Sequence, residues 1–254
     1  MQFDWQFYLT AFYRIGTRYY IIAGIVFFVF YIWKKKKWQY KKIQRRDAKT
    51  TDFLREIIYS TTTILIFSLF IYILLRPSVA PYTTRYLKIS DHGWLYYFAV
   101  YPLLFIIHDT YFYWFHRLMH HPRLFKYVHL VHHQSTNPSP WAAYAFHPIE
   151  AVIEQGIIFV FYFAFPIHIT HLVFFFLFSI IYNIYGHLGY ELYSSKFSKS
   201  KIGRWINTSV NHNQHHQYFK GNYGLYLLFW DRIMGTIRED YDTQFEEVTS
   251  RKNY

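Results

Sequence analysis

Hydrophobic residues fall in four long uncharged stretches, which are separated by charged or histidine-rich segments. The stretches are residues 19–33, 57–75, 93–107 and 155–190. A helix needs about 20 apolar residues to cross a bilayer, and the second stretch has this length. The first and third are shorter, but Tyr and Trp lie near their ends, as is typical of the membrane–water interface. We predict a membrane-spanning helix in each, and a buried helix of a soluble protein is the alternative.

The fourth stretch is too long for one crossing. Its 36 residues would form a helix of roughly 54 Å at about 1.5 Å per residue. Pro166 lies near its middle, and proline interrupts the hydrogen bonding of a helix. We therefore predict a helical hairpin, and with it an all-α, polytopic integral membrane protein that crosses the membrane five times.

The densest run of positive charge indicates the orientation of the chain. The segment KKKKWQYKKIQRR, residues 34–46, directly follows the first stretch, and such segments stay on the cytoplasmic side. Counting five crossings from there places the N-terminus outside and residues 108–154 and 191–254 in the cytoplasm. The first ten residues hold an acidic residue and no basic region, so we expect no cleaved signal sequence and assign membrane anchoring to the helices.

Composition narrows the functional classes further. Aromatic residues make up 24% of the 254 residues and charged residues only 17%, which favours a lipid environment. The formal charge of +12 gathers at the ends of apolar stretches, so an anionic membrane face explains it better than nucleic acid. The chain has no cysteine, which excludes disulfides, thiolate metal sites and cysteine nucleophiles. A metal site in this protein must use imidazole or oxygen ligands.

Histidines cluster in three short motifs on the segments predicted to be cytoplasmic. The motifs HRLMH, HLVHH and HNQHH supply His116, His120, His129, His132, His133, His212, His215 and His216. Spacings of three or four residues place side chains on one face of a helix, so that two imidazoles from one element can reach one ion. Eight imidazoles exceed the needs of one ion and predict a dinuclear site between helices. Imidazole alone does not select among zinc, copper, nickel and iron. We expect the isolated His92, His168 and His171 to be packed or interfacial residues.

These motifs resemble the histidine boxes of the membrane fatty acid hydroxylase and sterol desaturase superfamily. The stretches HDTYFYWFHRLMHH, HLVHH and NHNQHH carry the resemblance, and AFHPIE and NYGLYLLFWDRIMGT look like segments of its sterol C5-desaturase branch. The similarity covers residues 93–238 in order. It implies that residues 93–240 form the catalytic region, after an N-terminal membrane region of residues 1–92 and before a polar C-terminal tail of residues 241–254.

The resemblance also implies roles for individual residues. The eight box histidines would be metal ligands, and His187 in YGHLGYE matches a further family histidine, with an interfacial polar residue as the alternative. His108 lies about 12 Å along a helix from His116, too far to share its ion, so we expect His108 and Asp109 to orient a ligand.

Two other segments can be explained by local structure alone. His147 and Glu150 either mark the start of a helix, which Pro148 would suit, or brace the ligands and line the substrate entry. Trp230, Asp231 and Arg232 fit an interfacial anchor and a local ion pair, and we assign them no chemistry.

The implied activity is oxidation of a lipid by a non-haem di-iron centre with dioxygen as co-substrate. The chain contains no haem module, no dinucleotide fingerprint and no cysteine for an iron–sulfur cluster, so we expect a separate electron donor, a small cytochrome or a ferredoxin with its reductase. Desaturation of a sterol and hydroxylation of a fatty acyl or other lipid chain both fit. A histidine-rich metal transporter and a metal-dependent scaffold are the alternatives from other classes.

Overall fold

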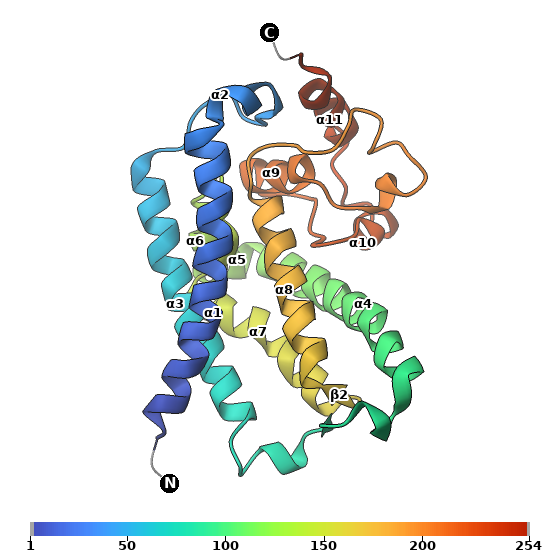
Figure 1. Ribbon diagram of the computed structural model, residues 1–254. Coiled ribbons are helices and arrows are strands. Elements are labelled where there is room, and N and C mark those ends of the chain that lie inside the picture. The colour runs from blue at the N-terminus through green and yellow to red at the C-terminus, as the bar shows by residue number, and fades with distance from the viewer. Residues whose placement is uncertain (1–2, 253–254) are drawn as a thin grey trace.

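Long helices dominate the computed structural model, which describes residues 3–252. Three of them stand roughly side by side along the long axis of the molecule: α1 (Trp5–Phe27), α3 (Thr50–Leu74) and α8 (Ile169–Gly186) (Figure 1). A π-helix over Phe28–Trp33 continues α1 without a break. In the described part of the chain these are the three helices that are long and apolar enough to cross a membrane.

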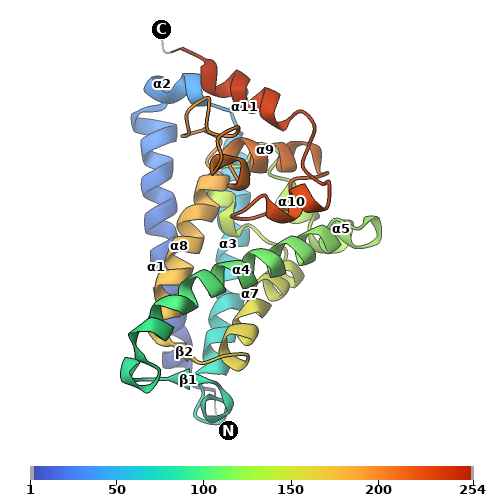
Figure 2. The ribbon, with the colours of Figure 1, turned by 90° about the vertical axis from the view of Figure 1, so that its right-hand side faces the viewer.

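Two further helices complete the bundle at an inclination to the others. They are α4 (Gly93–Met119) and α7 (Pro148–Phe163), and Figure 2 shows α4 leaning across the other helices. The membrane-spanning helix predicted for residues 93–107 is thus only the first part of a longer helix. The predicted hairpin is confirmed, because α7 ends at Phe163 and α8 begins at Ile169. The five crossings stay a prediction.

The connections at the lower end contain the only strands of the described chain. Strand β1 (Arg85–Tyr86) pairs in parallel with β2 (Ile167–His168), directly before α8. The sequence analysis did not anticipate this two-residue ladder. It ties the loop between α3 and α4 to the turn of the hairpin.

Short helices cover the opposite end of the bundle. They are α2 (Lys35–Trp38), α5 (Pro122–Val128), α6 (Leu130–His133), α9 (Ser209–Tyr218), α10 (Phe229–Ile233) and α11 (Tyr241–Ser250) (Figure 1). The segment predicted to be a polar tail is therefore largely helical. The spacing of Tyr241, Phe245 and Val248 places all three on one face of α11, where they pack with Ile43 and Val210.

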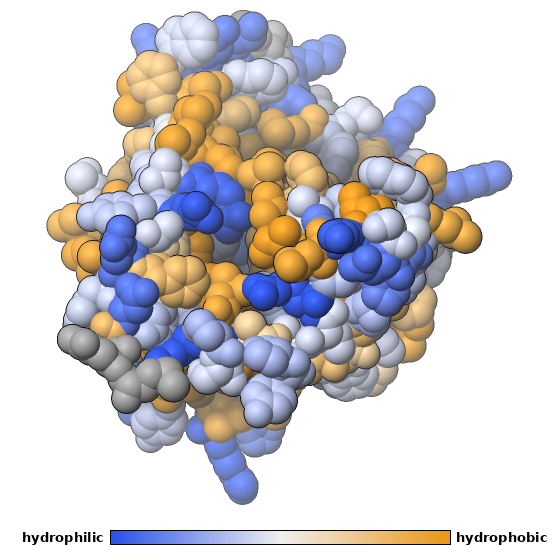
Figure 3. All heavy atoms as spheres, turned by 60° about the horizontal axis from the view of Figure 1, so that its bottom comes forward, coloured by the Kyte–Doolittle hydropathy of each residue, from blue (hydrophilic) through white to orange (hydrophobic). Residues whose placement is uncertain are grey.

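The outer faces of the long helices suit contact with lipid. On α1 and the π-helix that continues it, Ile21, Ile25, Phe28 and Ile32 recur at helical spacing, and between 51% and 61% of each side chain is exposed. Figure 3 shows the lower end, where hydrophobic groups cover much of the surface and hydrophilic groups are scattered among them. A water-exposed helix face of this kind would be costly, so these faces support an integral membrane protein.

We expect the two ends of the chain to lie on opposite sides of the membrane, because α1 begins and α11 ends at opposite ends of the bundle (Figure 1). Reporter fusions at each terminus would give opposite signals, with the C-terminal reporter in the cytoplasm. A topology map that separates His129 from His212 across the bilayer would contradict the fold.

Candidate metal centre

Nine histidines from four helical segments meet at the end of the bundle that the short helices cover. His116 lies in the last turn of α4 and His120 follows it; His129 joins α5 to α6, which carries His132 and His133; His187 directly follows α8; and α9 carries His212, His215 and His216. All nine predicted histidines are thus close together. Eight are buried, and His120 is partly exposed.

The ligand nitrogens form two separate groups, each spanning no more than 4.8 Å. The first group is His116, His120, His129, His133 and His215, and the second is His132, His187, His212 and His216. The motifs on α6 and α9 each contribute to both groups. Each group has enough donors to hold one metal ion, and the two ions would share the same supporting helices.

Within the first group, the Nε2 atoms lie unusually close. Nε2 of His116 is 3.1 Å from that of His129, and Nε2 of His120 is 3.1 Å from that of His133 and 3.2 Å from that of His215. Two nitrogens bound at about 2.1 Å to one ion, at about a right angle, lie about 3 Å apart. The observed spacing therefore matches donors that converge on a shared ion.

The second group has the same spacing around His187. Its Nε2 lies 3.1 Å from the Nε2 atoms of His212 and His216 and 3.3 Å from that of His132. Nδ1 of His187 lies 2.8 Å from the carbonyl oxygen of Asn183, one turn earlier in α8. A carbonyl oxygen only accepts, so Nδ1 carries the proton and Nε2 presents a lone pair to the group.

The same reasoning shows that no hydrogen bond joins Nε2 of His116 to Nε2 of His129 when Glu150 is ionised. Nδ1 of His116 donates to the carbonyl of Tyr223 at 2.8 Å, and Nδ1 of His129 faces Oε1 of Glu150 at 2.7 Å. Both protons are then on Nδ1, so the two facing Nε2 atoms have no proton between them. Two lone pairs 3.1 Å apart repel each other. A cation between them removes this repulsion, so the geometry fits a bound metal.

Burial keeps these imidazoles in the neutral form that binds metals. It lowers the pKa of His116 to about 4, and burial together with the neighbouring His116 lowers the pKa of His120 to about 2. For His133 and His215, burial and the adjacent imidazoles lower the pKa well below its usual range. Protons therefore compete weakly for the ligand nitrogens near neutral pH.

Within residues 3–252, Glu150 is the one carboxylate that forms a hydrogen bond with a predicted ligand. It is buried, and its Oε1 accepts from His129. Burial raises the pKa of the Glu150 carboxyl well above its usual range, while a cation on the far side of the His129 ring would favour the charged carboxylate. Glu150 therefore fixes the tautomer and the orientation of His129. The segment also starts a helix, as one of the two interpretations expected, since α7 begins at Pro148 and the side chain of His147 caps it.

A loop after α9 supplies the carbonyls that orient two other histidines. Nδ1 of His215 lies 2.8 Å from the carbonyl oxygen of Gly221, and Tyr223 serves His116 in the same way. Gly221 has a φ of +81°, and a Cβ there would lie 2.6 Å from the carbonyl oxygen of Thr236, so this turn requires glycine.

Asp231 holds this loop in place. Its carboxylate accepts from the backbone N–H groups of Tyr223 and Gly224 at 2.9 and 2.7 Å. The sequence indicated only a local ion pair for Asp231 and no chemistry. Its contact with the backbone of Tyr223, eight residues earlier, forms only in the folded chain. Its effect on the metal groups passes through the loop, so it positions the ligands that the loop orients.

His108 and Asp109 are placed differently from the expectation. Nδ1 of His108 pairs with the Tyr226 hydroxyl at 2.9 Å, and Asp109 accepts from the backbone N–H groups of Tyr226 and Leu227. Among residues 3–252, neither forms a hydrogen bond with a box histidine. They lie two turns before His116 on α4, where they meet the segment around Tyr226, so they fix that segment and do not orient a ligand.

An apolar cavity of about 260 Å³ extends from the bundle towards the histidines. A smaller void of about 10 Å³ lies directly against five of them. The two spaces share four lining residues, Phe112, Phe146, Glu154 and Asn183. A hydrophobic molecule in the cavity would therefore have one end close to the metal groups.

Comparison with known proteins gives consistent similarities. A family model described as fatty acid hydroxylase matches residues 101–236. A Delta(7)-sterol 5(6)-desaturase of Gibberella zeae is 34% identical over 161 residues, covering 63% of this chain and 48% of that protein. A Delta(7)-sterol 5(6)-desaturase of Aspergillus fumigatus is 29% identical over 235 residues, which cover 92% of this chain and 63% of that protein. Mouse lathosterol oxidase is 29% identical over 187 residues, which cover 72% of this chain and 60% of that protein. The chain spans about half the length of the curated relatives it matches, and no solved structure matches it.

We expect protein produced with adequate iron to hold about two metal ions per chain, because the nine donors form two groups. His120→Ala and His216→Ala remove one donor from different groups, and each variant is expected to lose about one of the two ions. Metal analysis of the purified variants measures this. His92→Ala, an exposed histidine at the other end of α4, is the control that keeps the full content. Wild-type metal content in both group variants would contradict the assignment.

Proposed function

The chain belongs to the fatty acid hydroxylase family, and from this premise we propose that it is a membrane-bound, non-haem di-iron oxidoreductase that acts on a lipid. The family membership confirms the resemblance seen in the histidine motifs. The observation that carries the proposal is the convergence of nine imidazoles in two groups at the inner end of an apolar cavity. The relatives described above are named for sterol substrates, and a sterol or another lipid is the substrate class that we propose for this chain.

The proposed metal ligands are His116, His120, His129, His133 and His215 for one iron and His132, His187, His212 and His216 for the other. When bound, iron supplies the activation of dioxygen that amino-acid side chains cannot provide. The side chains hold the metals, while Glu150 and the carbonyls of Asn183, Gly221 and Tyr223 orient the imidazoles. Metal transport fits less well, because nine donors in two groups, eight of them buried, favour retention over release.

The reaction requires electrons from outside. Hydroxylation uses dioxygen, two electrons and two protons, and yields the alcohol and one water. Desaturation uses the same inputs and yields the alkene and two waters. We propose that residues 93–240 carry out this chemistry and that the histidine groups face the cytoplasm, which the basic segment 34–46 supports.

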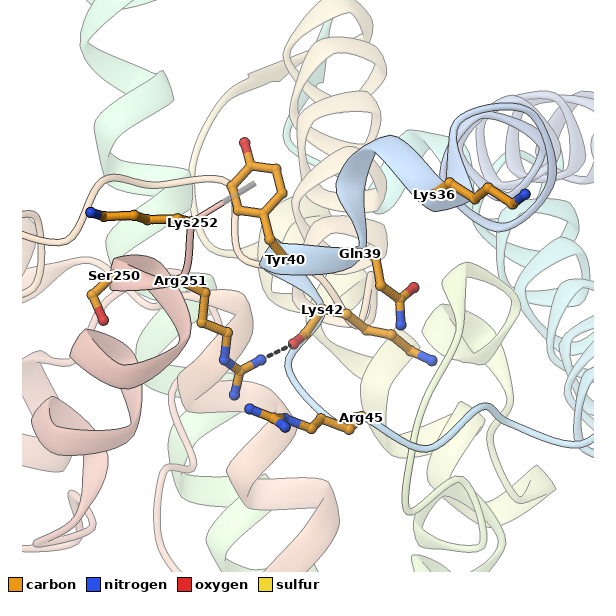
Figure 4. A pocket seen from close by; sticks show the side chains of 8 residues that line it. All are labelled: Lys36, Gln39, Tyr40, Lys42, Arg45, Ser250, Arg251 and Lys252. Carbon is orange, nitrogen blue, oxygen red and sulfur yellow. Dashed lines mark hydrogen bonds between the residues drawn. The ribbon is translucent and has the colours of Figure 1, made fainter. Parts of the chain in front are cut away.

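A basic pocket marks where an electron donor would dock. It is lined by Lys36, Gln39, Tyr40, Lys42, Arg45, Ser250, Arg251 and Lys252, which Figure 4 shows on α2, on the segment after α2 and around the end of α11. Next to Arg45, the side chain of Gln44 donates to Oδ1 of Asn213 on α9 at 2.9 Å. The pocket thus lies one hydrogen bond from the helix that carries three histidines, and its charge suits an acidic protein surface.

We expect activity to need dioxygen and an external donor. Wild-type protein supplied with host lipid extract, oxygen and a reducing system should give a lipid that has gained one oxygen atom or lost two hydrogen atoms, as detected by mass spectrometry. His132→Ala should give neither product, because it removes a donor from the second group. If the iron-loaded wild-type protein with a competent donor left every host lipid unchanged, the oxidase proposal would fail.

Charge reversal in the basic pocket is expected to weaken donor docking. A Lys36→Glu, Arg45→Glu double variant should lower the donor-dependent rate by about tenfold at low ionic strength, with a smaller effect at high salt. Steady-state kinetics against donor concentration would show this as a raised KM for the donor. Lys88→Glu, exposed at the opposite end, is the matched control. An unchanged KM for the donor in the double variant would place the docking site elsewhere.

A further inference from the structure

Helix α1 carries two arginines, Arg14 and Arg18, just before the uncharged stretch 19–33 that is predicted to cross the membrane. The N–H of Asp4 donates to the Tyr72 hydroxyl at 3.0 Å, and the Tyr19 hydroxyl donates to Oγ of Ser60 at 2.9 Å. These contacts align residues 4–19 of α1 with residues 60–72 of α3, inside its uncharged stretch. Arg14 and Arg18 lie within the aligned part, beside the apolar residues of α3, where Arg14 is exposed and Arg18 is half-buried.

Both arginines line the apolar cavity. The cavity runs along one face of α1, because the residues of α1 that line it recur at helical spacing: Phe7, Thr10, Ala11, Arg14, Ile15 and Arg18. Arg14 is also about two and a half turns from the start of α1 at Trp5, beyond the reach of an arginine side chain to that end of the helix. Charged residues within membrane helices commonly face a cavity and mark a substrate path.

The charges of the cavity are not balanced by the protein. An arginine stays protonated wherever it lies. The salt bridges among residues 3–252 involve neither Arg14 nor Arg18. Glu154 is the one acidic residue among those that line the cavity, so its lining holds two guanidinium groups and one carboxyl. An anion bound in the cavity would supply the missing negative charge.

The arginines are also close to the metal end. Arg18 and Tyr144 both line the cavity. The Tyr144 ring is 6.3 Å from the ring of Phe146, which is 5.1 Å from the ring of His132. A group bound to Arg18 is therefore two aromatic rings from the second histidine group, within the space proposed for the substrate.

We propose that the lipid bound in this cavity carries an anionic head group, held by Arg14 and Arg18, with its apolar part along Phe67, Ile71 and Leu172. A guanidinium group binds a carboxylate or a phosphate through paired hydrogen bonds, which a neutral hydroxyl cannot match in charge. This inference rests on the proposed function, whose substrate class it narrows. An anionic substrate would distinguish this chain from the relatives that are named for sterols.

The test is a binding comparison on iron-loaded protein in neutral detergent. The probes are oleate, oleyl alcohol as its neutral counterpart, lathosterol as a neutral sterol, and dioleoyl phosphatidic acid. We expect oleate to bind at least about tenfold more tightly than oleyl alcohol and lathosterol. Tighter binding of phosphatidic acid than of oleate would support the anionic site and identify a phosphate as its ligand. Equal binding of oleate and the two neutral probes would overturn the proposal.

Variants connect the preference to the arginines. Arg14→Gln, Arg18→Gln should bind oleyl alcohol as the wild type does but lose the preference for oleate, while Arg14→Lys, Arg18→Lys should keep part of it because the charge remains. Arg123→Gln, exposed on α5 and outside the cavity, is the matched control. An undiminished preference for oleate in the glutamine variant would contradict the assignment.

Metal content and melting temperature of each variant show whether it is folded. Binding is measured without turnover, so a protein that prefers oleate but oxidises no lipid would refute the proposed function and leave the anionic site standing. An active enzyme that binds oleate and the neutral lipids equally well would refute the anionic site and leave the proposed function standing.

Discussion

Repulsion between imidazole lone pairs is the constraint on which this structure depends. Nε2 atoms lie 3.1 to 3.3 Å apart in both histidine groups, and backbone carbonyls or Glu150 hold the protons of several rings on the other nitrogen. Without a cation, the protein would pay for this arrangement with buried, unsatisfied lone pairs. A metal in each group would make the same contacts stabilising and would couple metal binding to the folding of this end of the molecule.

The remainder of the fold serves to fix the directions of these rings. The long helices deliver His116 and His187 at their C-terminal ends, and α9 presents three histidines on a short, almost fully buried helix. The loop stabilised by Asp231 then supplies carbonyl acceptors from the outside. The apolar cavity reaches the groups from the opposite direction, so a lipid and an electron donor would approach the metals from different sides.

The sequence predicted which histidines come together, but not their division into two groups. Spacings of three and four residues indicated which histidines share a helix face, because that depends only on local geometry. The division into groups of five and four depends on how α4, α6, α8 and α9 pack, which no local pattern contains. The role of Asp231 was missed for the same reason, and Asp109 was misplaced because its partners are backbone amides more than 100 residues away.

X-ray absorption at the iron edge of the purified protein tests the central claim most directly, since it reports the atoms bound to the metal. The account predicts a first shell dominated by imidazole nitrogens, with the multiple scattering of four or five histidine rings per iron. A shell dominated by oxygen, with weak or absent imidazole scattering, would contradict the assignment of the nine histidines as ligands.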